Sequence, residues 1–215
     1  MESERIFIIG DIHGCLGMLK SLMDTIDWRT DKDRLIFIGD YIDRGEDPKG
    51  VVDYILTLLN ASPLVQCLEG NHESLFLDFL AGGDIDTFII NGGITTLRSY
   101  RIENKRENEQ LIPPDHMAFF KNLYSCIELE DYYIVHAGFR PGVDIQRQSL
   151  EDLLWIRDSF IYSDHDFGKK VIFGHTPFHE PLIMDNKIGL DTGAVYGNKL
   201  TCLEIPSMKF HSVRA

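Results

Sequence analysis

Four short apolar segments of this chain each end in a glycine that is followed at once by a polar side chain. The pairs are Gly10-Asp11, Gly39-Asp40, Gly70-Asn71 and Gly174-His175, and a fifth apolar segment, 132–135, runs directly into His136. Ligands of open α/β sheets bind at the carboxyl ends of the strands, so the pattern predicts buried strands whose polar ends converge on one spot. The glycines would let the backbone turn sharply and approach closely there.

The order of the segments predicts an α/β fold. Two stretches between the first three apolar segments, 16–26 and 51–59, carry apolar residues at helical spacing. Asp47 and Pro48 are typical of a helix beginning, as the N-cap and first residue of the second helix. Alternating strands and helices predict a mainly parallel sheet, and turn-separated runs after residue 171 predict antiparallel strands. The expected architecture is a β-α-β-α-β core with mixed sheets flanked by helices and a C-terminal antiparallel sheet.

No repeat and no linker divides the chain, and 215 residues suit one sizeable domain, so residues 1–215 are expected to form a single domain. The helical pattern of residues 74–124 is interrupted by glycine or proline clusters and by a charged stretch, at 82–83, 91–93, 113–114 and 101–109. We expect this part of the chain to form a helical layer with a mobile loop.

Charge and composition exclude several classes of partner. The chain has 34 Asp and Glu against 21 Lys and Arg, a net charge of −13, which repels nucleic acid and anionic membranes. Its apolar runs are far shorter than the ~20 residues of a membrane span. The polar beginning leaves no room for a secretory signal, and four scattered cysteines indicate neither disulfides nor a zinc site. We therefore expect a cytoplasmic protein with reduced thiols.

The side chains at the strand ends form a set of candidate metal ligands. They offer carboxylate, amide and imidazole donors without a thiolate, a mix that suits Mn²⁺, Fe or Zn²⁺. The set consists of Asp11, His13, Asp40, Asn71, His136 and His175. Six ligands, two of them carboxylates able to bridge, exceed what one ion with an open position requires. Two ions about 3.5–4 Å apart, as in two-metal hydrolases, are the natural occupancy.

Each of these residues alone also has a purely structural interpretation. Asp11 and Asp40 would serve as turn or cap residues, and Asn71 as the N-cap of a following helix. His136 and His175 would be core histidines. The ordered coincidence of five segments favours one shared site over separate structural roles. The other histidines match no ligand pattern and are expected to be surface or local structural residues: His116, His165, His179 and His211.

Five motifs, taken in order, resemble a known family. They are GDIHG at 10–14, GDYIDRG at 39–45, GNHE at 70–73, HAG at 136–138 and GH at 174–175. Together they resemble the phosphoprotein phosphatase (PPP) family of dinuclear metallophosphoesterases, over a length from Ile6 to about Glu204. The chain length and an NGG motif at 91–93 are most similar to the compact bacterial and phage serine/threonine protein phosphatases.

The resemblance implies that two divalent ions share Asp40 as a bridging ligand. The remaining ligands would be Asp11 and His13 for one ion, and Asn71, His136 and His175 for the other. Mn²⁺ is the expected ion, with Fe or Zn²⁺ as alternatives. Asn71 would also contact the substrate phosphate.

The same resemblance assigns four residues to the release of phosphate. His72 would donate a proton to the leaving group and would be oriented by Asp43. Arg44 and Arg157 would hold the phosphate oxygens through their planar guanidinium groups. Structural alternatives stay open at this point: a surface salt bridge between His72 and Asp43, and an ordinary ion pair of Arg157 with an acidic neighbour in its own helix.

The implied activity is hydrolysis of phosphoserine and phosphothreonine in proteins, and also of phosphotyrosine, by direct attack of a hydroxide that bridges the two ions. The partner would be a phosphorylated protein or peptide. Residues 190–205 also resemble the bacterial dinucleoside tetraphosphatases of this superfamily, except for Asn198 where a second glycine is common. Diadenosine tetraphosphate is therefore the alternative substrate. A non-catalytic phosphoprotein-binding module is disfavoured because every expected catalytic position is filled.

Overall fold

The strands assemble into two five-stranded sheets in the computed structural model, which describes residues 4–102 and 111–214. The strands are β1 (Ile6–Ile9), β2 (Arg34–Phe37), β3 (Val65–Cys67), β4 (Cys126–Glu128), β5 (Tyr132–Val135), β6 (Lys170–Phe173), β7 (Leu182–Ile183), β8 (Lys187–Gly189), β9 (Lys199–Ile205) and β10 (Lys209–Arg214). The first sheet has the order β10-β9-β1-β2-β3, and the second has the order β4-β5-β6-β8-β7. Segments from both ends of the chain therefore pair in the first sheet.

Each sheet contains three neighbouring strands that are parallel to one another. β1, β2 and β3 are parallel, and so are β5, β6 and β8, as the alternation of strands and helices predicted. Antiparallel pairs form among the C-terminal strands, as predicted, but these strands divide between the two sheets, and β8 is also parallel to β6. β7 pairs with β8 in the second sheet, whereas β9 pairs with β1 and β10 in the first. β9 lies between β10 and β1 in the first sheet, apart from β7 and β8. This inner position explains why six of its seven residues are buried.

Helices flank both sheets. They are α1 (Leu16–Thr25), α2 (Pro48–Ala61), α3 (Asn71–Leu80), α4 (Ile85–Ile90), α5 (Ile94–Ser99), α7 (Pro114–Lys121), α8 (Leu150–Trp155) and α9 (Asp158–Ile161), with 3₁₀ turns η2 (Ile145–Arg147) and η3 (Ala194–Tyr196). The breaks between α3, α4 and α5 fall at the predicted glycines. Residues 103–110, which hold most of the predicted charged stretch and mobile loop, lie outside the described residues.

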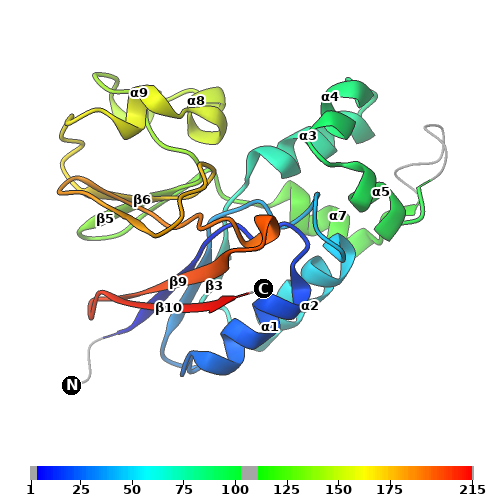
Figure 1. Ribbon diagram of the computed structural model, residues 1–215, viewed down its shortest axis with the longest axis horizontal. Coiled ribbons are helices and arrows are strands. Elements are labelled where there is room, and N and C mark those ends of the chain that lie inside the picture. The colour runs from blue at the N-terminus through cyan, green and yellow to red at the C-terminus, as the bar shows by residue number, and fades with distance from the viewer. Residues whose placement is uncertain (1–3, 103–110, 215) are drawn as a thin grey trace.

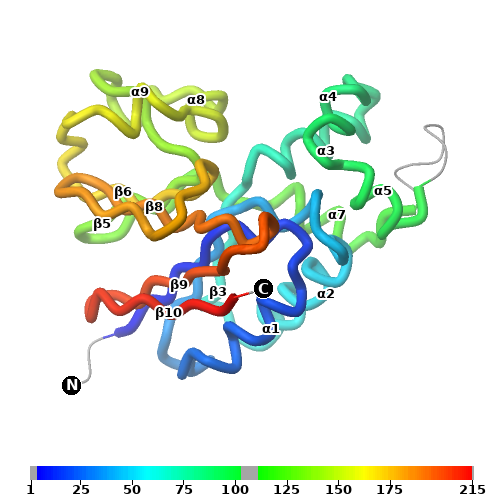
Figure 2. Tube along the Cα trace, viewed as in Figure 1, coloured from blue at the N-terminus to red at the C-terminus, as the bar shows by residue number. Residues whose placement is uncertain are grey.

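The two sheets pack against each other between two layers of helices (Figure 1). Ile8 and Ile36 of the first sheet belong to the same buried apolar cluster as Ile134 and Ile172 of the second. Side chains alternate along a strand, so the residues between them face the helices. In Figure 2, α8 and α9 lie on one side of β5 and β6, and α1 runs along β10 at the other side of the molecule. Burial on both faces explains why the strands read as continuous apolar runs.

Helix α2 begins with the N-cap and the proline that the sequence predicted. The carboxylate of Asp47 accepts a hydrogen bond from the Gly50 amide at 2.9 Å, and Pro48 occupies the first helical position. The Asp47 amide also donates to the Gly14 carbonyl at 3.0 Å. These contacts fix where the 39–47 loop ends, and that loop carries several predicted site residues.

The cysteines are free thiols, as expected. Cys67 and Cys202 are buried, Cys15 and Cys126 are partly buried, and burial raises the pKa of each. Within residues 4–102 and 111–214, no helix combines the length and the apolar character needed to cross a membrane.

Candidate metal centre and active site

The polar ends of five strands meet where the carboxyl edges of the two sheets come together. Asp11, Asp40 and Asn71 follow β1, β2 and β3, while His136 and His175 follow β5 and β6. The His175 amide donates to Asp11 Oδ2 at 2.9 Å. Asn71 Oδ1 lies 3.0 Å from His136 Nε2 and 2.8 Å from His175 Nδ1. The structure thus brings together the residues that the strand-end pattern selected.

Asp40 lies among these side chains. Its carboxylate oxygens lie 3.4 Å from His13 Nε2 and 3.5 Å from His136 Nε2. Two groups of candidate ligand atoms share Asp40, one with His13 and His72 and the other with His136 and His175. Adjacent donors around an octahedral ion with ~2.1 Å bonds lie about 3.0 Å apart, close to the distances seen here. A carboxylate common to both groups is what a bridging ligand requires.

Two buried polar atoms of this cluster have no hydrogen-bond partner among the described residues, Asp11 Oδ1 and His175 Nε2. Leaving such an atom unpaired away from water costs about 1–3 kcal/mol, so native proteins seldom do it without a ligand. Burial raises the pKa of Asp11, and so do the carboxyl groups of Asp191 and Asp40. Crowded carboxyl groups with an unpaired oxygen fit a bound divalent cation.

Two imidazoles are held in the tautomer that a metal ligand needs. Nδ1 of His13 lies 2.9 Å from the Ile42 carbonyl, and Nδ1 of His136 lies 2.8 Å from the Ile38 carbonyl. A carbonyl only accepts, so each Nδ1 donates and each Nε2 keeps its lone pair on the side of Asp40. Burial lowers the pKa of both imidazoles, to about 3 for His13. Both are therefore neutral, as ligands must be.

The loops that carry the candidate site have strained backbones. Of the seven described non-glycine residues with positive φ angles, five are site candidates: His13, Asp40, Asp43, Arg44 and His175. The left-handed region costs a non-glycine residue roughly 1–2 kcal/mol. Strain concentrated at one place is typical of a functional site.

The glycines of the pattern allow close approach, as predicted. A Cβ on Gly174 would lie 2.1 Å from Asp11 Oδ1, and one on Gly70 would lie 2.2 Å from Asp40 Oδ1. Gly39 has a φ of 103°, and its Cβ would meet the Gly70 amide nitrogen at 2.7 Å. None of these positions accepts a side chain unless a candidate ligand or its supporting backbone moves.

His72 and Asp43 form a buried pair, so the alternative of a surface salt bridge is wrong. Nδ1 of His72 lies 2.6 Å from Asp43 Oδ2, and both side chains are almost fully buried. Burial raises the pKa of Asp43. Nε2 of His72 lies 4.0 Å from Asp40 Oδ2. This geometry suits a side chain that exchanges a proton, or that binds an ion, through Nε2.

The two predicted phosphate-binding arginines lie beside the candidate ligands. Nη1 of Arg44 lies 2.7 Å from His13 Nε2. Nη1 of Arg157 donates to the His175 carbonyl and to Thr176 Oγ1, each at 3.2 Å. Arg157 therefore contacts the loop after β6, and these hydrogen bonds are not the ion pair with an acidic neighbour in its own helix that was the structural alternative. Arg157 is exposed, so its other N–H groups are accessible to an anionic ligand.

Glu73 is a site residue that the sequence analysis missed. Its buried carboxylate accepts hydrogen bonds from four amides: Asp40 and Tyr41 at 2.8 Å, Gly70 at 3.0 Å and Ile42 at 3.3 Å. The loop after β2 is thereby held against the beginning of α3. Glutamate at the third position of a helix typically bonds the amide of its N-cap, and this spacing was the available signal.

Thr96 and Asp191 were missed as well. Thr96 Oγ1 accepts a hydrogen bond from the Asp43 amide at 2.9 Å and donates to the Asp43 carboxylate. Asp191 is buried near Asp11 and Asp40, and burial raises its pKa to about 6. Asp191 follows β8 much as the other candidates follow their strands, which was a usable signal. Nothing in the sequence marked Thr96, which lies in the helical layer.

The chain belongs to the calcineurin-like phosphoesterase family, whose model matches residues 4–206. Members of this family are metallophosphoesterases with a dinuclear divalent metal centre, and the groups around Asp40 are candidate ligands for one. The bis(5'-nucleosyl)-tetraphosphatase PrpE (asymmetrical) of Bacillus cereus strain AH187 is 28% identical, over 96% of this chain and 92% of the relative. The enzyme of the same name from Oceanobacillus iheyensis is also 28% identical, over 97% and 92%.

Solved structures of both nucleotide and protein phosphatases share the fold. A "putative diadenosine tetraphosphatase" has a TM-score of 0.75 at 22% identity, over 100% of this chain and 95% of that one. A cold-active protein tyrosine phosphatase has a TM-score of 0.70 at 17% identity, over 93% and 73%. A serine/threonine phosphatase from Saccharomyces cerevisiae has 0.68 at 14%, over 99% and 80%. The predicted fold, an α/β metallophosphoesterase with two mixed sheets flanked by helices, is confirmed.

Gly174→Ala is expected to weaken metal binding because its new methyl group would collide with Asp11 Oδ1. Calorimetric titration with Mn²⁺ should show the loss of one site or an affinity lower by roughly 10–100-fold. Gly17→Ala is the matched control, since its Cβ would meet nothing within 4 Å, and it should titrate like the unchanged protein. Unaltered Mn²⁺ binding by folded Gly174→Ala would contradict a role for Asp11 as a ligand.

Proposed function

We propose that the chain hydrolyses dinucleoside tetraphosphates, with diadenosine tetraphosphate as the representative substrate. Cleavage would be asymmetrical, so water would divide the four phosphates into a nucleoside monophosphate and a nucleoside triphosphate. The observation that carries the proposal is the similarity, over nearly the whole chain, to relatives named asymmetrical tetraphosphatases. This substrate replaces the phosphorylated protein first expected, and it is the alternative that residues 190–205 suggested.

The position of residues 190–205 supports the same substrate. The segment places Asp191 beside the candidate centre and includes η3, where the Tyr196 ring lies 5.8 Å from the guanidinium carbon of Arg44. Asn198, where the resemblance is imperfect, donates from its side-chain amide to the Thr192 carbonyl at 2.8 Å. Asn198 therefore stabilises this turn, and the segment keeps its place next to the site.

Divalent ions are needed before this site can attract a polyphosphate. The site holds five buried carboxyl groups but only two arginines. The carboxyl groups belong to Asp11, Asp40, Asp43, Glu73 and Asp191. Each phosphate of the substrate carries a negative charge, which these carboxylates repel. Two divalent ions, which we expect to be Mn²⁺, would supply compensating positive charge and the Lewis acidity that activates water.

The residues that would hold the ions are those that the sequence selected. Asp40 would be shared. The other ligands would be Asp11 and His13 at one position, and Asn71, His136 and His175 at the other. The unpaired Asp11 Oδ1, the neutral imidazoles and the contacts of Asn71 Oδ1 support this set.

The arginines would position the polyphosphate. The Nε2 lone pair of His13 serves one partner at a time, so Arg44 would release His13 when an ion occupies that nitrogen. Its guanidinium would then be available to phosphate oxygens. Arg157, held on one nitrogen by the His175 loop, would offer its remaining N–H groups to the same chain of phosphates.

His72 would protonate the leaving group through Nε2, while Asp43 stabilises the imidazolium. The need for this proton depends on the substrate. A leaving phosphate has a pKa of roughly 6 and departs readily, whereas a serine alkoxide is far more basic. The buried His72–Asp43 pair therefore also favours a second candidate function, hydrolysis of phosphoserine or phosphothreonine in proteins. That reaction depends more on a general acid than cleavage of a dinucleotide does.

The deciding experiment compares kcat/KM of the Mn²⁺-loaded protein for diadenosine tetraphosphate with that for a phosphoserine peptide. We expect kcat/KM to be roughly a hundredfold or more higher for the dinucleotide, because contacts between an enzyme and its own substrate can provide discrimination of this size. ATP and AMP should appear in equal amounts, and chelated protein should be inactive. A preference for the peptide would contradict the proposal and support the second candidate, while two molecules of ADP would contradict the asymmetrical cleavage.

His72→Asn tests the proton donor. Phosphoserine hydrolysis should slow by roughly 10²–10⁴, the usual contribution of a general acid, and dinucleotide cleavage should slow less. Metal content, measured by atomic absorption, should be unchanged. If the variant loses metal in step with activity, His72 is a ligand and not the donor.

Thr96→Val tests whether Thr96 positions Asp43. The change keeps the shape of the side chain but removes both hydrogen bonds to Asp43, so kcat should fall roughly tenfold or more. The alkaline limb of the pH–rate profile should move to lower pH, because the carboxylate that stabilises the imidazolium is held less well. Thr96→Ser retains the hydroxyl and should restore both values. A loss of kcat without a shift in the pH profile would indicate a structural role only.

A further inference from the structure

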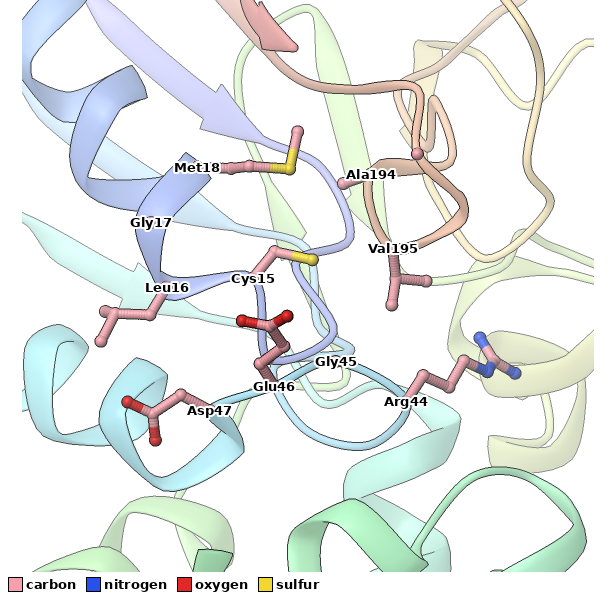
Figure 3. Close-up of a pocket in the computed structure, with 12 residues that line it drawn as sticks. Cys15, Leu16, Gly17, Met18, Arg44, Gly45, Glu46, Asp47, Ala194 and Val195 are labelled. Carbon is pink, nitrogen blue, oxygen red and sulfur yellow. The ribbon is translucent and has the colours of Figure 1, made fainter. Parts of the chain in front are cut away.

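A groove of about 410 Å³ adjoins Arg44 (Figure 3). Its walls come from three segments: 14–18 at the beginning of α1, 44–47 before α2, and residues 194, 195 and 197 around η3. Sites for small molecules typically have volumes of ~300–1,000 Å³, so the groove is large enough to hold one. The roles proposed above for phosphate chemistry use only Arg44 among the residues that line it.

The groove combines apolar walls with an acidic rim. Figure 3 shows the side chains of Cys15, Met18 and Val195 along the walls, with Glu46 between Cys15 and Asp47 on the rim. Glu46 is exposed, so its carboxylate is accessible to a ligand. Apolar walls suit a flat ring, and carboxylates accept hydrogen bonds from hydroxyl or amino groups.

We propose that this groove binds the base and ribose of one nucleoside of the substrate, which names a specificity site for the proposed function and rests on it. Arg44 lines the groove and also contacts His13 of the candidate centre. A nucleoside in the groove would therefore extend its 5'-phosphates past Arg44 toward the centre. Glu46 would accept hydrogen bonds from the ribose hydroxyls, as acidic residues do in other nucleotide sites.

The distribution of charge favours a nucleoside over an acidic peptide. Glu46 and Asp47 repel anionic groups from the groove itself, so the phosphates are directed to the end where Arg44 lies. The phenyl ring of a phosphotyrosine would match the apolar walls, but it has no donors for Glu46. A ligand with an uncharged, hydroxyl-bearing body and an anionic tail satisfies both parts.

The first test requires no cleavage of a dinucleotide. Hydrolysis of p-nitrophenyl phosphate by the Mn²⁺-loaded protein would be measured in the presence of AMP, ribose 5-phosphate or phenyl phosphate as competing ligands. We expect AMP to inhibit roughly tenfold more strongly than ribose 5-phosphate, because only AMP fills the groove. Glu46→Gln, which keeps the volume, should weaken inhibition by AMP severalfold and leave inhibition by phenyl phosphate unaltered. Equal inhibition by AMP and ribose 5-phosphate would overturn the nucleoside site.

The second test fills the groove. Val195→Trp should lower the ratio of kcat/KM for diadenosine tetraphosphate to that for p-nitrophenyl phosphate by roughly tenfold or more. Ile183→Trp is the matched control, because Ile183 is 62% exposed on β7, and its ratio should stay unchanged. Dinucleotide cleavage that neither Val195→Trp nor Glu46→Gln alters would overturn the groove and leave the proposed function intact. Preference for AMP without any dinucleotide cleavage would instead overturn the proposed function and retain the nucleoside site.

Discussion

The carboxylate of Glu73 accepts hydrogen bonds from the amides of Asp40, Tyr41, Ile42 and Gly70, and so it joins the loop after β2 to the beginning of α3. That loop places Asp40 and then Asp43 in the left-handed region, which costs each residue roughly 1–2 kcal/mol. Four hydrogen bonds from backbone amides to one buried carboxyl group offset this strain. The position of Asp40 depends on Glu73, and both groups of candidate ligands include Asp40.

The same arrangement explains why an acidic chain can carry a phosphoesterase site. Carboxyl groups gather at the meeting edges of two sheets because glycines such as Gly174 leave room for them. Bound ions would reverse the local charge, and the arginines beside the centre would extend the positive region toward the substrate. Arg44 lies between this region and the groove, so on our proposal the hydrolysis of phosphate and the choice of substrate would depend on neighbouring but separable residues.

Sequence reasoning found the strand-end residues because each follows an apolar run and a glycine, a local pattern with a clear physical cause. It could not show that β9 enters the first sheet, since pairing between distant segments leaves no local signal. The same limit applies to Thr96, which reaches Asp43 across 53 positions of sequence. The substrate was harder to predict than the fold, because the candidate metal ligands and the His72–Asp43 pair suit phosphate esters and phosphate anhydrides alike. The groove beside Arg44 depends on three separate segments, and no one of them predicts it.

We propose that Asp40 bridges two ions. Anomalous diffraction from crystals of the Mn²⁺-loaded protein, collected at the manganese edge, tests it most directly. We predict two peaks roughly 3.5–4 Å apart, with the Asp40 carboxylate between them. A single peak, or two peaks of which only one contacts Asp40, would contradict the claim.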